Sequence, residues 1–270
     1  MGITVGGAAL AGAVAARHRE INRRLSNVDE RELRSPSLLP GWDRLTIVCH
    51  LRFGAVATAR MTEDAVAGRS TSFYPDGRAV QRQATLEPDR GESHADVVRS
   101  LADQSTRLDE LWRTLDDRLW RLPVEEPEEN PDLGRIDVWT LAILRLTEVE
   151  VHGSDLDLDL SPWSTTFVSA ALPMRLGWLP TRRANHRSPD RLVAGSWNLV
   201  STDGPSFLVR ARGKRVAVDQ AEPGADADAS IIGTSRELLS FILGRTALDD
   251  LETRGDQDPA ASFLAAFPPP

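Results

Sequence analysis

The stretch Pro40-Gly41-Trp42-Asp43-Arg44-Leu45-Thr46-Ile47-Val48-Cys49-His50-Leu51 and the later stretch Glu148-Val149-Glu150-Val151-His152 decide how this chain is interpreted. Glu148 and His152 are four positions apart, so on a helix both side chains lie on one face, one turn apart. A histidine from another helix, for which His50 is the candidate, would complete a set of three ligands. Three protein ligands with one open position are typical of a catalytic metal site rather than a structural one.

The first 160 residues are predicted to be helical and to form a four-helix bundle. Their apolar residues follow helical spacing, and turn signals separate the segments. Asp43 is a plausible N-cap for the second helix, and Ser93 with Asp96 gives a weak capping box for the third. The predicted helices are 4–27, 42–67, 94–115 and 136–153.

The pattern changes after His152 to short runs of strand type between helical segments. Residues 161–270 are therefore predicted to form a small α+β domain with an antiparallel sheet. The predicted strands are 196–201, 206–210, 215–219 and 229–232, and the predicted helices are 165–179, 235–243 and 259–267. The expected fold class is thus α+β, with an N-terminal four-helix bundle (1–160) and a C-terminal α+β domain (161–270).

Composition excludes several classes of function. The 270 residues carry a net charge of −8 and a pI of about 5.2, so nucleic acid is not an expected partner. The apolar start is too short and too rich in Gly and Ala to cross a membrane. With Cys49 as its one cysteine the chain forms no internal disulfide, and a cytoplasmic location is expected. Arginine in place of lysine is typical of a GC-rich bacterial genome.

Each of these residues also has a plainer interpretation. A Glu/His pair at this spacing also occurs on solvated helix faces, and a lone His50 would be read as a core histidine. Asp155 is either an acceptor that holds an imidazole or a surface carboxylate. Cys49 is expected to be a small core residue rather than a nucleophile. The three remaining histidines with no obvious partner are interpreted as surface residues: His18, His94 and His186.

Taken together, the motifs resemble one family. The Gly41-Trp42 turn followed by His50-Leu51, and Glu148-x-x-x-His152-x-x-Asp155-Leu156, are similar to the mycothiol-dependent maleylpyruvate isomerases, which belong to the DinB-like metal-binding bundles. The resemblance implies that His50, Glu148 and His152 bind a divalent metal, usually zinc. It extends to the loop Tyr74-Pro75-Asp76-Gly77-Arg78 and to Leu243-Gly244-Arg245 in the C-terminal domain, and so covers nearly the whole chain.

The resemblance also implies a chemistry. Mycothiol, the small thiol of actinobacteria, would supply the nucleophile, since a bound cation stabilises a thiolate. We expect a mycothiol S-transferase acting on a small organic electrophile. The alternatives are a cis–trans isomerase of the maleylpyruvate type and a non-catalytic metal-binding or stress module. Arg78 and Arg82 are candidates for binding the cofactor, and Arg245 for catalysis from the second domain. A monomer or homodimer is expected.

Overall fold

The computed structural model describes residues 5–124, 136–185, 192–255 and 257–269. The described residues form two compact units, the first ending at Phe167 and the second beginning at Val168. The domain boundary predicted from the sequence, between residues 160 and 161, stays a prediction.

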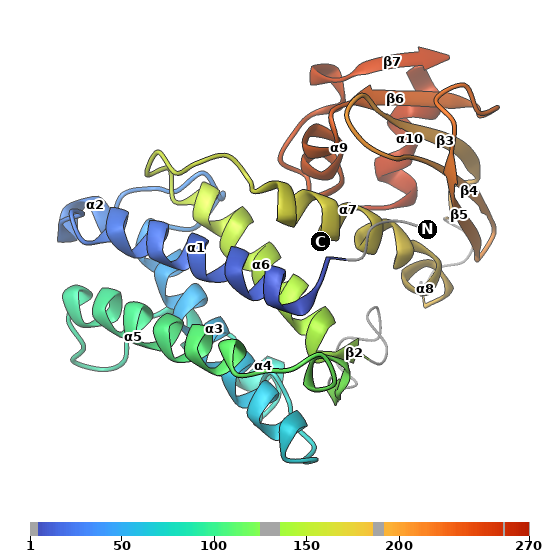
Figure 1. Cartoon of the computed structure of the whole chain (residues 1–270). Coiled ribbons are helices and arrows are strands. Elements are labelled where there is room, and N and C mark those ends of the chain that lie inside the picture. The colour runs from blue at the N-terminus through green and yellow to red at the C-terminus, as the bar shows by residue number, and fades with distance from the viewer. Residues whose placement is uncertain (1–4, 125–135, 186–191, 256, 270) are drawn as a thin grey trace. The chain divides into compact units, whose positions relative to one another are not determined.

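Four long helices form the first unit: α1 (Gly7–Leu25), α3 (Arg44–Val66), α5 (His94–Arg113) and α6 (Val138–Asp155) (Figure 1). Local chemistry sets where they begin. The Asp43 carboxylate accepts from the Thr46 amide at 2.7 Å, so Asp43 is the N-cap of α3, as predicted. Ser93 and Asp96 form a capping box at the start of α5. The predicted four-helix bundle is confirmed, although residue 4, the expected start of the first helix, lies outside the described residues.

Short elements connect these helices. They are α2 (Glu30–Leu33), α4 (Arg78–Gln81), η1 (Ala84–Leu86), η2 (Leu119–Arg121) and the strand pair β1 (Pro123–Val124) and β2 (Ile136–Asp137). One of them, η2, packs closely against α1. A Cβ at Gly7 would lie 2.3 Å from the Trp120 ring, so the start of α1 rests directly on that indole.

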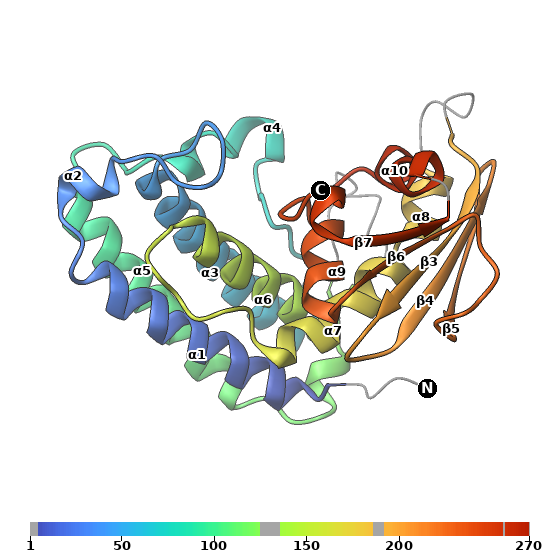
Figure 2. The ribbon, with the colours of Figure 1, turned by 90° about the horizontal axis from the view of Figure 1, so that it is seen from above.

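The second unit is a sheet with helices. Its elements are α7 (Thr165–Gly177, whose first turn belongs to the first unit), α8 (Leu179–Ala184), β3 (Gly195–Ser201), β4 (Ser206–Arg212), β5 (Arg215–Ala221), β6 (Ala229–Gly233), α9 (Ser235–Ile242), η4 (Leu248–Asp250), β7 (Glu252–Gly255) and α10 (Gln257–Ala266). Figure 2 shows the strands side by side in the order β5, β4, β3, β6, β7. Trp197 of β3 packs edge-on against Phe263 and Phe267, with ring centroids 5.7 and 5.8 Å apart. The α+β class is confirmed.

One detail of the predicted sheet is wrong: it is mixed rather than wholly antiparallel. β3 and β6 pair in parallel, with Trp197 opposite Ala229, while the other pairs are antiparallel. After two hairpins β5 runs in the same direction as β3, and residues 222–228 then cross back so that β6 joins the free side of β3. The Asn198 amide holds this crossing by donating to the carbonyls of Glu222 and Pro223. β7, which the sequence pattern did not predict, pairs with β6 and forms one edge of the sheet.

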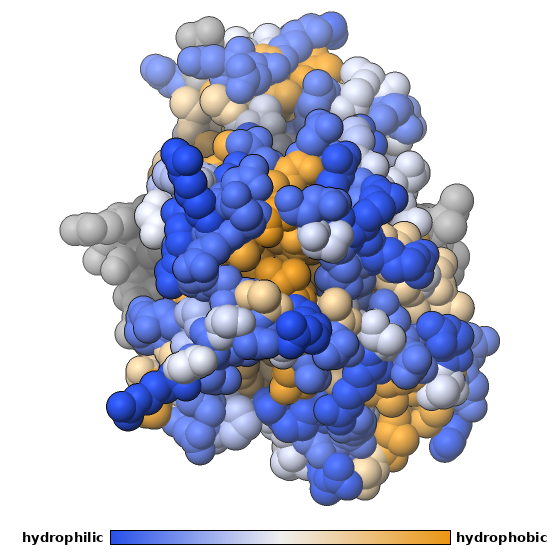
Figure 3. Space-filling view, turned by 90° about the vertical axis from the view of Figure 1, so that its left-hand side faces the viewer, coloured by the Kyte–Doolittle hydropathy of each residue, from blue (hydrophilic) through white to orange (hydrophobic). Residues whose placement is uncertain are grey.

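Figure 3 shows one face of the molecule, on which hydrophilic residues prevail and apolar residues gather near the middle. Among the described residues, the large apolar side chains that are exposed are Leu38, Val66 and Val80. No helix in the described part of the chain combines the length and hydrophobicity that a membrane crossing requires.

Candidate metal centre

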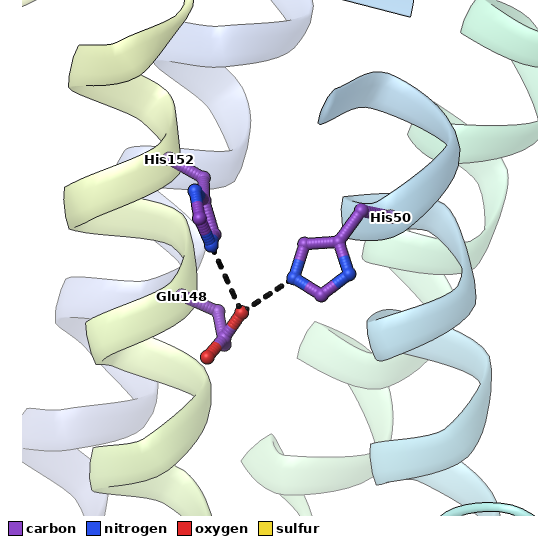
Figure 4. Close-up of side chains that lie close together, drawn as sticks. All are labelled: His50, Glu148 and His152. Carbon is purple, nitrogen blue, oxygen red and sulfur yellow. Dashed lines mark hydrogen bonds and ion pairs between the residues drawn. The ribbon is translucent and has the colours of Figure 1, made fainter. Parts of the chain in front are cut away.

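His50, Glu148 and His152 meet between α3 and α6, where the His50 side chain is 11% and the Glu148 side chain 41% exposed. His50 extends from α3, and Glu148 and His152 extend from adjacent turns of α6 toward it (Figure 4). Nε2 of His50 donates to Oε2 of Glu148 at 2.7 Å, and Nε2 of His152 lies 3.5 Å from the same oxygen. One ligand atom from each residue falls within 4.8 Å of the other two. The structure therefore brings together the three residues that the sequence singled out.

This donor set fits a divalent cation. Two imidazoles and one carboxylate are ligands that zinc takes in catalytic sites, at about 2.0–2.2 Å from the ion. Ligand atoms around a tetrahedral ion then lie roughly 3.4 Å apart. The separation of His152 and Glu148, 3.5 Å, already matches this value. The shorter contact to His50 is a direct hydrogen bond and must open for an ion to enter.

Electrostatics keep His50 and Glu148 in forms suited to a cation. Burial lowers the pKa of His50 below its ordinary value, although the Glu148 carboxylate opposes this. Burial raises the pKa of Glu148, but the hydrogen bond from His50 and nearby positive charge, that of Arg145 included, outweigh that effect and hold this pKa well below its usual range. A neutral imidazole and an ionised carboxylate are the forms that bind metals.

Two neighbours fix the His152 ring. Its Nδ1 donates to Oδ2 of Asp155 at 3.0 Å, and Asp155 is buried, so the surface interpretation of this carboxylate is wrong. When one nitrogen of an imidazole binds a metal, a carboxylate that accepts from the other nitrogen fixes the orientation of the ring. The Trp42 ring stacks on His152 at 6.0 Å between centroids and makes a T-shaped contact with His50 at 5.5 Å. Trp42 thus forms one wall of the site.

Residues beside the ligands on their own helices face elsewhere. Glu150, between the two ligands of α6, pairs with Arg17 of α1, and both side chains are buried. It is therefore a structural ion pair and not a fourth ligand. Cys49 is buried next to His50, and burial raises the pKa of its thiol to about 11. The interpretation of Cys49 as a core residue agrees with this placement.

The three predicted arginines fall in different places. Arg82 lies near the site: its Nη1 donates to the Tyr74 hydroxyl at 3.4 Å, and its charge lowers the pKa of His50. Arg78 is exposed and lies over the Tyr74 ring at 5.8 Å from the centroid. Arg245 belongs to the second unit, just after α9, where Gly244 adopts a positive φ of 70°. The roles of all three remain predictions.

One histidine was misjudged from the sequence. His18, expected at the surface, is 2% exposed in the bundle interior, where it contacts Asp109 and Arg145. Its position supplied the signal, since it follows Val14 by four residues and precedes Ile21 by three on the buried stripe of α1. His94 is partly exposed and pairs with Glu30 at 3.0 Å. His186 lies outside the described residues.

Fold and site together define a class: a four-helix bundle with a His₂Glu candidate metal centre, followed by a small α+β unit. Residues 14–157, more than half of the chain, match the family profile described as the mycothiol maleylpyruvate isomerase N-terminal domain. The chain belongs to the mycothiol-dependent maleylpyruvate isomerase family, which confirms the identification made from the motifs.

Solved structures agree with this assignment at the level of the fold. The crystal structure of the mycothiol-dependent maleylpyruvate isomerase is 17% identical, with a TM-score of 0.64, covering 92% of this chain and 93% of that chain. A single-residue mutant of that enzyme matches with the same identity and coverage at a TM-score of 0.62. Among the curated proteins, no sequence matches this chain significantly.

Proposed function

We propose that this protein is a zinc-dependent enzyme that uses mycothiol to form a carbon–sulfur bond with a small organic electrophile. The observation that supports this proposal is the convergence of His50, Glu148 and His152, since three ligands leave a fourth position open. A divalent ion held there stabilises the thiolate form of a thiol, which is the nucleophilic form. The protein's one thiol, Cys49, is buried and protonated at neutral pH, so the nucleophile has to come from outside.

The surrounding residues have distinct tasks in this proposal. Asp155 holds the His152 ring in the orientation that turns Nε2 toward Glu148. Trp42 covers one face of the His152 ring, makes a T-shaped contact with His50, and so limits access of water from that side. In S-transfer the thiolate sulfur attacks the electrophilic carbon, the carbon–sulfur bond forms, and the leaving group departs with its electron pair. Where the substrate is an activated alkene, the carbon next to the attacked one takes a proton instead.

A cis–trans isomerase is the second candidate, and the family match supports it. In that reaction the thiolate adds to a carbon–carbon double bond, the resulting single bond rotates, and the thiolate leaves again. A dicarboxylate substrate needs cationic partners, for which arginine is well suited. Arg82, near His50, is one candidate for this role, and Arg245 is a second.

One experiment tests the proposal and separates its two forms. The zinc-loaded protein is incubated with mycothiol and either a haloalkyl bimane or maleylpyruvate, and free thiol and product are measured together. S-transfer consumes one thiol for each product molecule, whereas isomerisation leaves the thiol concentration unchanged. Acceleration of neither reaction over a matched His152→Ala variant would remove both forms of the proposal.

A further inference from the structure

A string of three hydrogen-bonded polar side chains runs through the bundle one helical turn away from the candidate metal centre. Arg145 of α6 donates from Nη2 to Nε2 of His18 at 3.0 Å, and Nδ1 of His18 contacts Oδ1 of Asp109 at 2.8 Å. An arginine only donates, so Nε2 accepts and the proton of a neutral His18 lies on Nδ1. The string thus contains one cation, one neutral ring and one anion.

Arg145 is unusual for a buried residue. It is 2% exposed, yet its Nε and Nη1 have no hydrogen-bond partner among the described residues. The bundle makes room for it, because a Cβ at Gly54 would lie 2.7 Å from Nη1. A guanidinium left partly unsatisfied in a core is costly, and a costly buried group calls for an explanation.

Its place relative to the ligands supplies that explanation. Arg145 precedes Glu148 by three residues on α6, and Gly54 follows His50 by four on α3, so the guanidinium lies one turn away from both ligands. The charges of Arg145 and Glu148 act on each other in the metal-free site. Once a divalent ion takes up the Glu148 charge, ion and ligands carry a net +1, and the Arg145 charge adds to it.

We propose that Arg145, held by His18 and Asp109, is a positioning residue that makes the metal centre prefer an anion in its open position. This inference rests on the proposed metal site and adds a determinant of what that site accepts. A thiolate is one such anion, and a small inorganic anion serves as a probe of the same preference. The electrostatic role has a characteristic sign: removing the Arg145 charge weakens anion binding without weakening metal binding, since a nearby cation repels the ion. A merely structural role would weaken both.

The test uses the full chain loaded with Co²⁺ and titrated with azide, followed by visible absorption, with Co²⁺ affinity measured by competition with a chelator. Arg145→Met keeps the length of the side chain and removes its charge, whereas Arg145→Lys keeps the charge. We expect azide affinity to fall roughly tenfold or more in Arg145→Met. It should stay close to wild type in Arg145→Lys, with Co²⁺ affinity retained in both.

Equal azide affinity in Arg145→Met and wild type would overturn the inference, as would a loss of azide binding that follows a matching loss of Co²⁺ affinity. Should Arg145→Met not fold, Asp109→Asn takes its place. It removes the anion at the far end of the string, so azide binding should tighten, and unchanged or weaker binding overturns the inference. Failure of the wild-type protein to bind Co²⁺ is a separate result and counts against the proposed metal site itself.

Discussion

The two imidazoles of the candidate metal centre are held in different ways. His152 has a carboxylate on its second nitrogen, whereas Nδ1 of His50 is buried and has no partner among the described residues. Orientation of His50 therefore comes from its place on α3, from Glu148 and from the T-shaped contact with Trp42. The two histidines lie on separate helices, and loss of either one leaves two of the three candidate donors.

We predict that His50→Ala and His152→Ala each lose stoichiometric zinc. Two remaining ligands do not hold a zinc ion at the affinity of three. His94→Ala is the matched control, since His94 pairs with Glu30 away from the ligands. Metal content is measured on the purified proteins after dialysis against a weak chelator. Wild-type zinc content in both ligand variants would mean that the ion binds elsewhere.

Cys49 provides a prediction about the nucleophile. Since its thiol pKa is raised to about 11, less than one part in a hundred is thiolate at neutral pH by the ordinary titration relation. Cys49→Ala should therefore keep its activity with mycothiol within about threefold and lower the free energy of unfolding by about 1 kcal/mol through lost packing. Turnover that disappears while zinc content and folding stay normal would make Cys49 the nucleophile.

At the scale of elements, α3 and α6 approach closely at Gly54. An alanine in a helix interior is ordinarily about 1 kcal/mol more favourable than glycine. At Gly54 the added Cβ meets Nη1 of Arg145 at 2.7 Å, and this guanidinium is buried and bonded to His18, which restricts its movement away from the contact. We therefore expect Gly54→Ala to destabilise the bundle by about 1–3 kcal/mol. Gly12 of α1 is the control, because nothing lies within 4 Å of a Cβ built there. Urea unfolding should show stabilisation for Gly12→Ala, and the same sign for both variants would contradict this packing.

The contact of α1 with α5 and α6 through His18 predicts a pH dependence. Burial lowers the pKa of His18 in the folded state below 6.5, its ordinary value, with the hydrogen bond to Asp109 opposing. Below pH 6.5 the unfolded chain therefore binds more protons than the folded one, and stability falls as the pH drops toward the folded pKa. We predict that the metal-free His18→Gln variant loses less stability between pH 7 and pH 5 than the metal-free wild-type protein. Parallel profiles of melting temperature for the two proteins would show that His18 does not contribute.

At the scale of the whole molecule, the open prediction is that Arg245 contributes to catalysis. Its plain interpretation is an arginine just after a helix C-terminus, where a positive charge interacts favourably with the helix dipole. We predict that Arg245→Ala lowers kcat/KM by roughly tenfold or more, equal to about 1.4 kcal/mol of transition-state stabilisation. Zinc content should not change. Arg254→Ala, at an exposed position of β7, is the control. Equal kcat/KM for wild type and Arg245→Ala would leave Arg245 a structural role.

The sequence by itself determined the local structure and singled out the three candidate ligands. The N-cap at Asp43 and the capping box at Ser93 depend on residues three positions apart, so they can be read along the chain. The pairing of Glu148 with His152 follows from helical spacing in the same way. The motifs around these residues also sufficed to identify the family.

Only the tertiary structure decided the features that join distant segments. Asp109 and Arg145 reach His18 from two other helices, and no spacing along α1 names those partners. The direction in which β6 joins β3 depends on how the chain crosses back, because alternation of apolar residues is the same in parallel and antiparallel pairs. Local patterns encode periodicity and capping, while burial and charge depend on which helices and strands meet in space.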